Sequence, residues 1–351
     1  MTTPVHIVAT GARTSLGLQA LPSAAALRAG ISSMGDHPFM IDQVGEAMPG
    51  ALDSFIEPGI MGPERFLTLA KSALRETCAL LDNTKEPLQR LPVYLGLPEY
   101  RPGFSEQGAR EIQNGLGNID ELPIQISEVK VLTEGHAAGL YALAVATEHI
   151  RTGALEVCIV GGVDSYFHPD TMEWLDDNRQ LVGTVSRSAF VPGEAASFCL
   201  LTSAEFSKRL GLDVLARVSG VAVARESKLI KTSDICLGEG LTTTVKSAVG
   251  GLRSGETIND IICDINGERY RGEEWGFVCL RLPQYFDAPT VYLSPADCWG
   301  DTGAASGPLF VMLACQAIAG GYANGPRTLL WASSEGGLRG AVVLETAGSL
   351  Q

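Results

Sequence analysis

Apolar and polar positions follow two rhythms along the chain. Short apolar runs that suit buried strands alternate with longer stretches in which apolar positions recur every three or four residues. This alternation predicts β-α-β units around a mostly buried sheet. In the first half it predicts strands at 6–10, 93–97, 129–132, 156–161 and 196–202, and helices near 64–81, 106–115 and 136–151.

The second half repeats this arrangement. It predicts strands at 216–224, 261–264, 290–293, 328–331 and 341–344, and helices near 241–252, 273–280 and 304–319. We therefore expect a duplicated α/β architecture in which residues 1–205 and 206–351 form two halves of one compact unit. Two stretches rich in Gly, Pro and Asp, 37–62 and 167–188, are predicted to be loops and short helices that cover a site.

Charge and hydropathy narrow the range of partners. The 351-residue chain carries a net charge of −14, which would repel nucleic acid. Arg225, Lys228 and Lys231 lie close enough in sequence to form a small basic patch for an acidic carrier protein, although a solvated face is the simpler interpretation. No run approaches the roughly 20 apolar residues that a membrane span needs, and the N-terminus lacks the features of a secretory signal. These observations predict a cytoplasmic protein that does not bind membranes.

Neither the cysteines nor the histidines are spaced like metal ligands. The eight cysteines form no C-x-x-C pair, and those at 158, 199 and 279 lie inside apolar runs, where a thiol acts as a small hydrophobic group. We expect reduced, buried thiols, as is usual in cytoplasm. No metal and no cofactor are predicted.

Five segments, in order, resemble the β-ketoacyl synthases of the thiolase-like superfamily. They are VATGARTSLG at 8–17, TEGHAAG at 133–139 with GGVDS at 161–165, FVPGEAA at 190–196, NG at 266–267 followed by two glutamates at 273–274, and GDTGAASG at 300–307. FVPGEAA, which is close to the family's F-V-x-G-E-G-A, is the most specific of them. The resemblance implies a thiolase-like, layered α-β-α-β-α fold made of two similar halves.

The resemblance also implies where the catalytic residues would lie. The family's nucleophilic cysteine corresponds to His136, and its two histidines correspond to Asn266 and Asp301. Condensation needs a thiolate at a helix start to accept the acyl chain, and the two histidines stabilise the enolate that forms when malonyl loses carbon dioxide. An anionic Asp301 would destabilise that enolate. Because all three positions are substituted, we expect condensing activity to be lost.

Four further positions are assigned to the same pocket. Glu194, within FVPGEAA, corresponds to a glutamate that supports the family's site from behind, and Phe190 and Thr302 belong to the motifs around the pocket. Glu335 falls where the family has a gating phenylalanine, and Ala296 replaces the usual lysine upstream of the second histidine. Glu335 and the covering segments would either fill the pocket or line it, and the sequence leaves both possibilities open.

Two interpretations of His136 and Asp301 follow. The dipole of the helix that begins at His136 favours a neutral imidazole. If Asp301 lies across the pocket, as the resemblance implies, the two side chains form either a general-base pair or a polar contact in an inactive pocket. The second is favoured, because Ser186 and Ser188 are the only plausible nucleophiles near this pair in sequence and nothing in the sequence fixes their geometry.

Three functional hypotheses result. The first is a ketosynthase homologue without condensing activity that binds a partner or an acyl-type ligand through the ancestral pocket. The second is the non-catalytic subunit of a ketosynthase heterodimer, similar to subunits that determine chain length. The third is an enzyme of acyl or ketide metabolism, of the acyltransferase or hydrolase type, centred on His136 and Asp301. Members of the family dimerise through the strand before the nucleophile, here 129–132, which implies a homodimer or a heterodimer with a ketosynthase, and a carrier protein as a further partner.

Overall fold

The elements of the computed structural model follow the predicted alternation. The structure describes residues 3–83, 90–183, 186 and 188–348. The strands are β1 Val5–Thr14, β2 Gly35–Ile41, β3 Ala47–Gly50, β4 Arg90–Leu97, β5 Gln125–Thr133, β6 Val157–Ser165, β7 Glu194–Ser203, β8 Ala216–Arg225, β9 Asp260–Cys263, β10 Arg327–Ser333 and β11 Leu338–Glu345. The α-helices are α1 Ala20–Arg28, α2 Gly62–Cys78, α3 Glu106–Gly117, α4 Ala138–Arg151, α5 Pro169–Asp177, α6 Ala204–Leu210, α7 Glu239–Ala248, α8 Arg269–Arg281, α9 Ala296–Trp299 and α10 Ser306–Ala319. Short 3-10 turns at Gly135–Ala137 and Gly303–Ala305 lead into α4 and α10.

The two halves of the main sheet, with five and four strands, have related strand orders. The order of the whole sheet is β5-β4-β6-β7-β1-β8-β11-β10-β9. Counted outward from β1, the strands of the first half follow the order β1-β7-β6-β4-β5, so the first strand of this half lies beside its last. The second half gives β8-β11-β10-β9, in which its first strand is again followed by its last. β1 joins the halves, because its start, Val5–Ile7, pairs with both β7 and β8.

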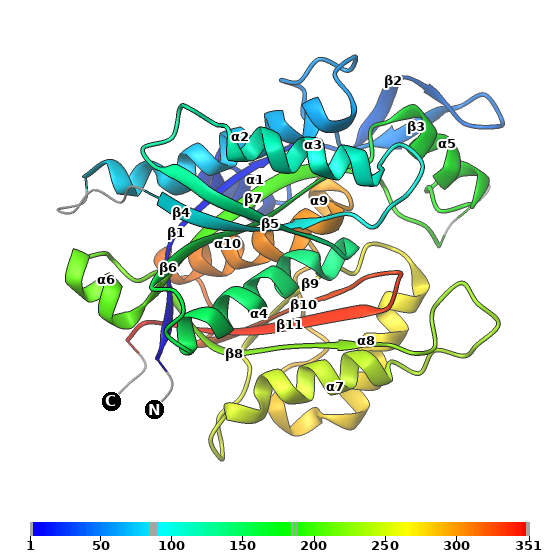
Figure 1. Cartoon of the computed structure of the whole chain (residues 1–351). Coiled ribbons are helices and arrows are strands. Elements are labelled where there is room, and N and C mark those ends of the chain that lie inside the picture. The colour runs from blue at the N-terminus through cyan, green and yellow to red at the C-terminus, as the bar shows by residue number, and fades with distance from the viewer. Residues whose placement is uncertain (1–2, 84–89, 184–185, 187, 349–351) are drawn as a thin grey trace.

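A register shift after Ile7 releases β1 from β8, and beyond it β1 pairs only with β7. The sheet therefore opens into two layers, and α4 and α10 lie between them (Figure 1). In the same view α2 and α3 cover the outer face of the upper layer, and α7 and α8 cover that of the lower one (Figure 1). α10 is buried over its first ten residues, as expected for a helix that contacts protein on all sides. The fold is the layered, thiolase-like α/β fold that the resemblance implies.

Two sequence predictions differ from the structure. The segment 290–293 is not a strand: its only pairing is a single bridge between Leu293 and Ile262 at the outer edge of β9. The stretch 37–62 was expected to contain loops and short helices, but much of it lies in the β2–β3 hairpin. The other covering stretch, 167–188, contains α5, and its residues 184, 185 and 187 lie outside the described residues. In the described part of the chain, no helix is both long and apolar enough to span a membrane.

Candidate functional site

Motifs from both halves meet where α4 and α10 begin. His136 lies in the turn before α4, after Gly135, whose φ of +69° suits glycine. Asp301 follows Gly300, whose φ is +72°. A Cβ at Gly300 would lie 2.8 Å from the carbonyl oxygen of Val191, so this close passage also requires glycine. The backbone of Asp301 pairs with that of the FVPGEAA segment through a bridge to Pro192.

His136 and Asp301 are in direct contact. The His136 Nε2 atom lies 2.9 Å from both carboxylate oxygens of Asp301, and the Asp301 side chain is 2% exposed. The carboxylate also accepts hydrogen bonds from the amide of Asn266, from the hydroxyl of Tyr166 at 3.2 Å and from the backbone N–H of Gly303 at 2.7 Å. The structure therefore brings the three predicted catalytic positions together around one carboxylate that accepts from four donors.

Arg271 completes this cluster from α8. Its Nη2 atom lies 3.1 Å from His136 Nε2, and Nη1 donates to Asp264 and, at 2.7 Å, to the Ser333 carbonyl. Its Nε atom lies 3.3 Å from a carboxylate oxygen of Glu268. The guanidinium is fully buried, so it depends on these partners for its charge.

Electrostatics favour an ion pair between His136 and Asp301. Burial by itself would lower the pKa of His136, but the adjacent Asp301 carboxylate outweighs it and the pKa is raised overall, although Arg271 opposes this. Burial would raise the pKa of Asp301, whereas His136 and Arg271 hold it well below its usual range. The raised pKa opposes the neutral imidazole expected from the helix dipole, because a carboxylate at hydrogen-bond distance acts more strongly than the dipole.

The four supporting residues have different surroundings. Glu194 is fully buried and accepts two hydrogen bonds from Arg65, at 2.5 and 2.6 Å, so it is a structural ion pair. The Phe190 ring is buried with its centroid 5.3 Å from that of Tyr166, within the same site. Thr302 is directed away, because its hydroxyl contacts Ser306 at 3.1 Å.

Glu335 lies on the outer side of the site. Its carboxylate accepts hydrogen bonds from Gln180 at 2.9 Å and from Lys231 at 2.5 Å. Lys231 also lies 3.2 Å from Glu268, whose other oxygen faces Arg271. Glu335 is thus tied by ion pairs to the edge of the central cluster.

The space in front of His136 is small. A cavity of about 60 Å³ adjoins it, lined partly by Tyr166, Trp174, Leu175 and Phe190. This volume holds a few water molecules, whereas pockets for small organic ligands typically measure about 300–1,000 Å³. Of the two possibilities that the sequence leaves open, the structure shows a largely filled pocket.

No candidate nucleophile is in place among the described residues. The lining of the cavity includes neither Ser186 nor Ser188. Cys263 is the cysteine that lies beside Asp264 and Asn266, but it is fully buried, and burial raises the pKa of its thiol far above neutral. Sequence reasoning missed Tyr166 and Arg271, which carry no motif of their own.

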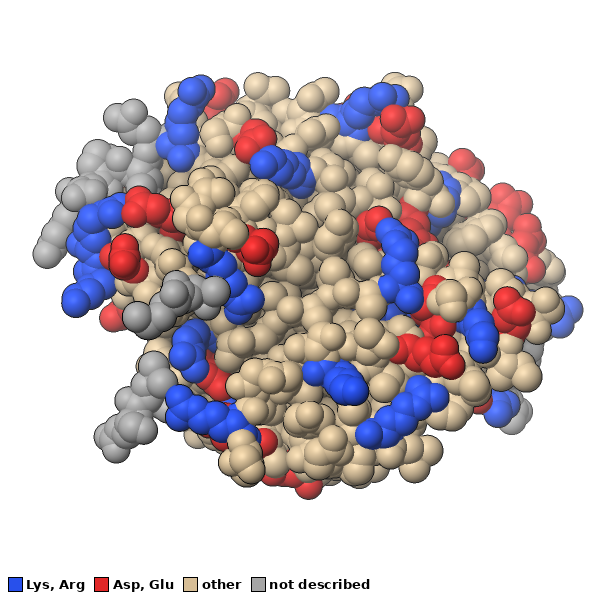
Figure 2. Space-filling view, turned by 60° about the horizontal axis from the view of Figure 1, so that its bottom comes forward, with Lys and Arg blue, Asp and Glu red and all other residues tan. Residues whose placement is uncertain are grey.

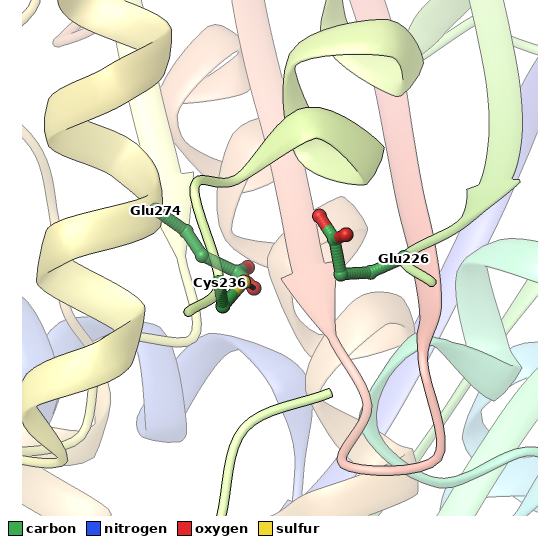
Figure 3. A group of neighbouring side chains, drawn as sticks. All are labelled: Glu226, Cys236 and Glu274. Atoms are coloured by element: carbon green, nitrogen blue, oxygen red, sulfur yellow. Dashed lines mark hydrogen bonds between the residues drawn. The ribbon is translucent and has the colours of Figure 1, made fainter. Parts of the chain in front are cut away.

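A second group of potential ligand atoms lies apart from this cluster. Glu226, Cys236 and Glu274 bring three such atoms within 4.8 Å of one another, and in Figure 3 Glu274 lies beside Cys236 while Glu226 approaches from the other side. Arg339 donates to Glu274 at 2.5 and 2.9 Å, and the N–H of Gly240 donates to Glu226 at 2.7 Å. Burial and the Glu274 carboxylate raise the pKa of Cys236 to about 11. These contacts account for the group without a metal.

Comparisons with known proteins agree with this fold. The β-ketoacyl synthase N-terminal domain family matches residues 132–206. A Streptomyces virginiae protein named as a polyketide β-ketoacyl synthase is 28% identical over 103 residues, which cover 26% of this chain and only 24% of that protein.

The solved structures match over more of the chain. A type II polyketide ketosynthase in complex with its acyl-carrier protein aligns with a TM-score of 0.81 at 14% identity, covering 99% of this chain and all of the matched one. The ishigamide ketosynthase/chain length factor aligns with a TM-score of 0.80 at 19% identity, over 99% of this chain and all of the other. The chain is thus ketosynthase-like in fold over nearly its whole length and in sequence over 132–206.

Proposed function

We propose that this chain is the non-condensing subunit of a heterodimer with a ketosynthase, similar to a chain length factor. The observation that carries the proposal is the cluster of His136, Asn266, Asp301 and Arg271. By the resemblance, three of its members occupy the positions of the nucleophile and the two histidines.

The charges of the cluster are unsuited to condensation. The reaction needs a thiolate, then a negative charge that develops on an enolate and is stabilised by donors around it. Here the anion is already present as Asp301, and it uses the donors that surround it. His136 cannot accept an acyl chain as a thiolate would, and the Asp301 carboxylate, which raises its pKa, favours the protonated imidazole.

The filled pocket favours a partner over a stored acyl ligand. A cavity of about 60 Å³ leaves no room for an acyl chain next to His136. Of the hypotheses drawn from the sequence, ligand binding in the ancestral pocket therefore loses support and the paired subunit gains it. One matched structure is itself a ketosynthase/chain length factor.

A surface for such pairing is available at β5. It is the edge strand of the main sheet, and it pairs only with β4 among the described strands. Its exposed residues include the charged pair Glu128 and Lys130, whereas Val131 packs against the adjoining apolar core. An open edge of this kind can add a strand from a partner.

The experiment is co-expression with ketosynthases encoded in the same genome, followed by size-exclusion chromatography with light scattering. We expect one of them to form a complex whose mass is the sum of 37.1 kDa and its own chain. Lys130→Glu, at an exposed position on β5, should weaken that complex, because it sets a second negative charge beside Glu128 in the strand interface. Lys246→Glu, which makes the same change at an exposed position on α7, is the matched control and should leave the complex intact. A stable homodimer that binds no ketosynthase would contradict the proposal.

A second function, hydrolysis or acyl transfer by His136 and Asp301, is favoured by one observation. The small cavity reaches His136, whose Nε2 atom lies 2.9 Å from Asp301. The test is hydrolysis of p-nitrophenyl acyl esters of increasing length. An activity that His136→Gln abolishes would support the enzyme, whereas equal rates in the two proteins would exclude it.

A further inference from the structure

A second cavity contains a group of arginines. It measures about 290 Å³ and lies where β8 and β10 begin and β11 ends. Four arginines line it: Arg151, Arg217, Arg253 and Arg327. We call this cavity the arginine pocket. Arg151 is the last residue of α4, so the 14-residue helix separates the pocket from His136 by about 20 Å.

Two carboxylates in the arginine pocket are already paired. Glu345 binds Arg217 through one oxygen and the Nε atom of Arg327, at 2.9 Å, through the other. One oxygen of Glu256 lies 2.5 Å from Arg327 Nη2, and the other accepts the backbone N–H of Arg253 at 2.8 Å. Four guanidinium groups and two carboxylates leave a net charge of +2.

The side chains of Arg151 and Arg253 have no carboxylate partner within the described residues. Arg151 is half-buried and Arg253 is exposed, so both can reorient toward a ligand in the cavity. The position of Arg151 in the last turn of α4 is explained in part by the helix dipole. That explanation does not extend to Arg253, which follows α7 in a loop.

We propose that the arginine pocket binds a small molecule that carries phosphate groups. Guanidinium groups form two parallel hydrogen bonds to phosphate oxygens, and two of them remain available here. The volume of about 290 Å³ is close to the lower limit for ligand pockets, which suits a phosphate ester or a pyrophosphate.

The charge of the rest of the chain differs in sign from that of the arginine pocket. The chain has a net charge of −14, so its long-range field repels anions, and anion binding has to arise from local contacts. Figure 2 shows the side of the molecule that bears α7 and α8, with acidic and basic side chains interspersed over most of it and several Lys and Arg side chains close together at the left. A confined pocket with a charge of +2 is therefore a local exception on an acidic protein.

The test uses the whole chain and inorganic pyrophosphate as the probe. Isothermal titration calorimetry is run at constant ionic strength on the wild type and on Arg151→Gln/Arg253→Gln. Neither of these side chains holds a carboxylate in the described structure, so the double variant should fold. We expect saturable binding by the wild type and at least tenfold weaker binding by the double variant.

The matched control is a second removal of positive charge elsewhere. Arg269→Gln/Arg110→Gln alters two exposed arginines on α8 and α3 and should bind pyrophosphate like the wild type. Equal weakening in both double variants, or no saturable binding by the wild type, would overturn the proposal. The result is independent of the ketosynthase pairing, because the readout needs no partner subunit.

Discussion

Replacing Asp301 by Asn tests whether the central cluster is an ion pair that stabilises the fold. The carboxylate is buried and accepts hydrogen bonds from four donors, whereas an amide has one acceptor oxygen and turns an NH₂ group toward those donors. Removing one partner of a buried ion pair typically costs about 3–5 kcal/mol. Because His136 can lose its proton in the variant, we expect a loss of about 3 kcal/mol in the free energy of unfolding near pH 6.

The loss of stability in Asp301→Asn should depend on pH, and the two pKa shifts give the direction of that dependence. A pKa of His136 raised in the folded state means that the stabilisation is complete below the unfolded pKa of about 6.5 and is lost as the pH rises through the folded value. A lowered pKa of Asp301 means that its contribution is present above the unfolded value of about 3.8 and is lost only at more acidic pH. The difference between wild type and Asp301→Asn should therefore be largest between about pH 4.5 and 6.5 and should shrink toward pH 9.

Urea unfolding followed by circular dichroism at pH 6 and pH 9 measures both quantities. Asp234→Asn removes the same charge from an exposed loop and should change stability by less than about 0.5 kcal/mol. A difference of less than about 1 kcal/mol between Asp301→Asn and the wild type at pH 6 would refute the reasoning. A difference that grows between pH 6 and pH 9 would refute it as well.

Three further predictions follow from packing, burial and thiol chemistry. A Cβ at Gly162 would lie 2.2 Å from the carbonyl oxygen of Ala304, so Gly162→Ala should lower the melting temperature by several degrees, whereas Gly272→Ala, which meets nothing within 4 Å in an α-helix, should leave it unchanged or raise it. Glu194→Gln leaves the buried Arg65 without its counter-charge and should cost about 3 kcal/mol in urea unfolding, and a loss below about 1 kcal/mol would contradict the assigned structural role. Iodoacetamide at pH 7.5 should label no cysteine rapidly in the native protein, because no described thiol has a lowered pKa. Rapid labelling of Cys263, the thiol beside the central cluster, measured by mass spectrometry, would contradict the non-condensing proposal.

The regular elements could be predicted because each follows its own local pattern. The helix expected at 136–151 is found as the short turn before α4 followed by α4 itself, since its apolar positions recur at helical spacing. The strand predicted at 290–293 is wrong, because the local pattern there is not supported by pairing with neighbouring strands. The apolar run resembles a strand, but it is only four residues long and lies between Pro289 and Pro295. Leu293 makes two backbone hydrogen bonds with β9 and the pairing goes no further.

The candidate site was only partly predictable, because its charges depend on tertiary contacts. The motifs singled out His136, Asn266 and Asp301, and the fold brings these three side chains into contact. Arg271 lies within the polar sequence ERYRGEE, which reads as a solvated helix face, yet its side chain is fully buried. Tertiary contacts supply most of its partners: Asp264, which follows β9, the Ser333 carbonyl and His136.

The proposed substitutions depend on one another, and this bears on whether activity could be recovered. An aspartate in a buried pocket needs a cation, and His136 and Arg271 supply two. A single change of Asp301→His would remove the anion and leave His136 facing another imidazole and a buried guanidinium, so the new pair would stay neutral and the site would lose stability. A single change of His136→Cys would place a thiol beside the Asp301 carboxylate, which raises the pKa of the thiol and opposes the thiolate that condensation needs. Neither change is favourable by itself, because His136, Asp301 and Arg271 depend on one another for their charges.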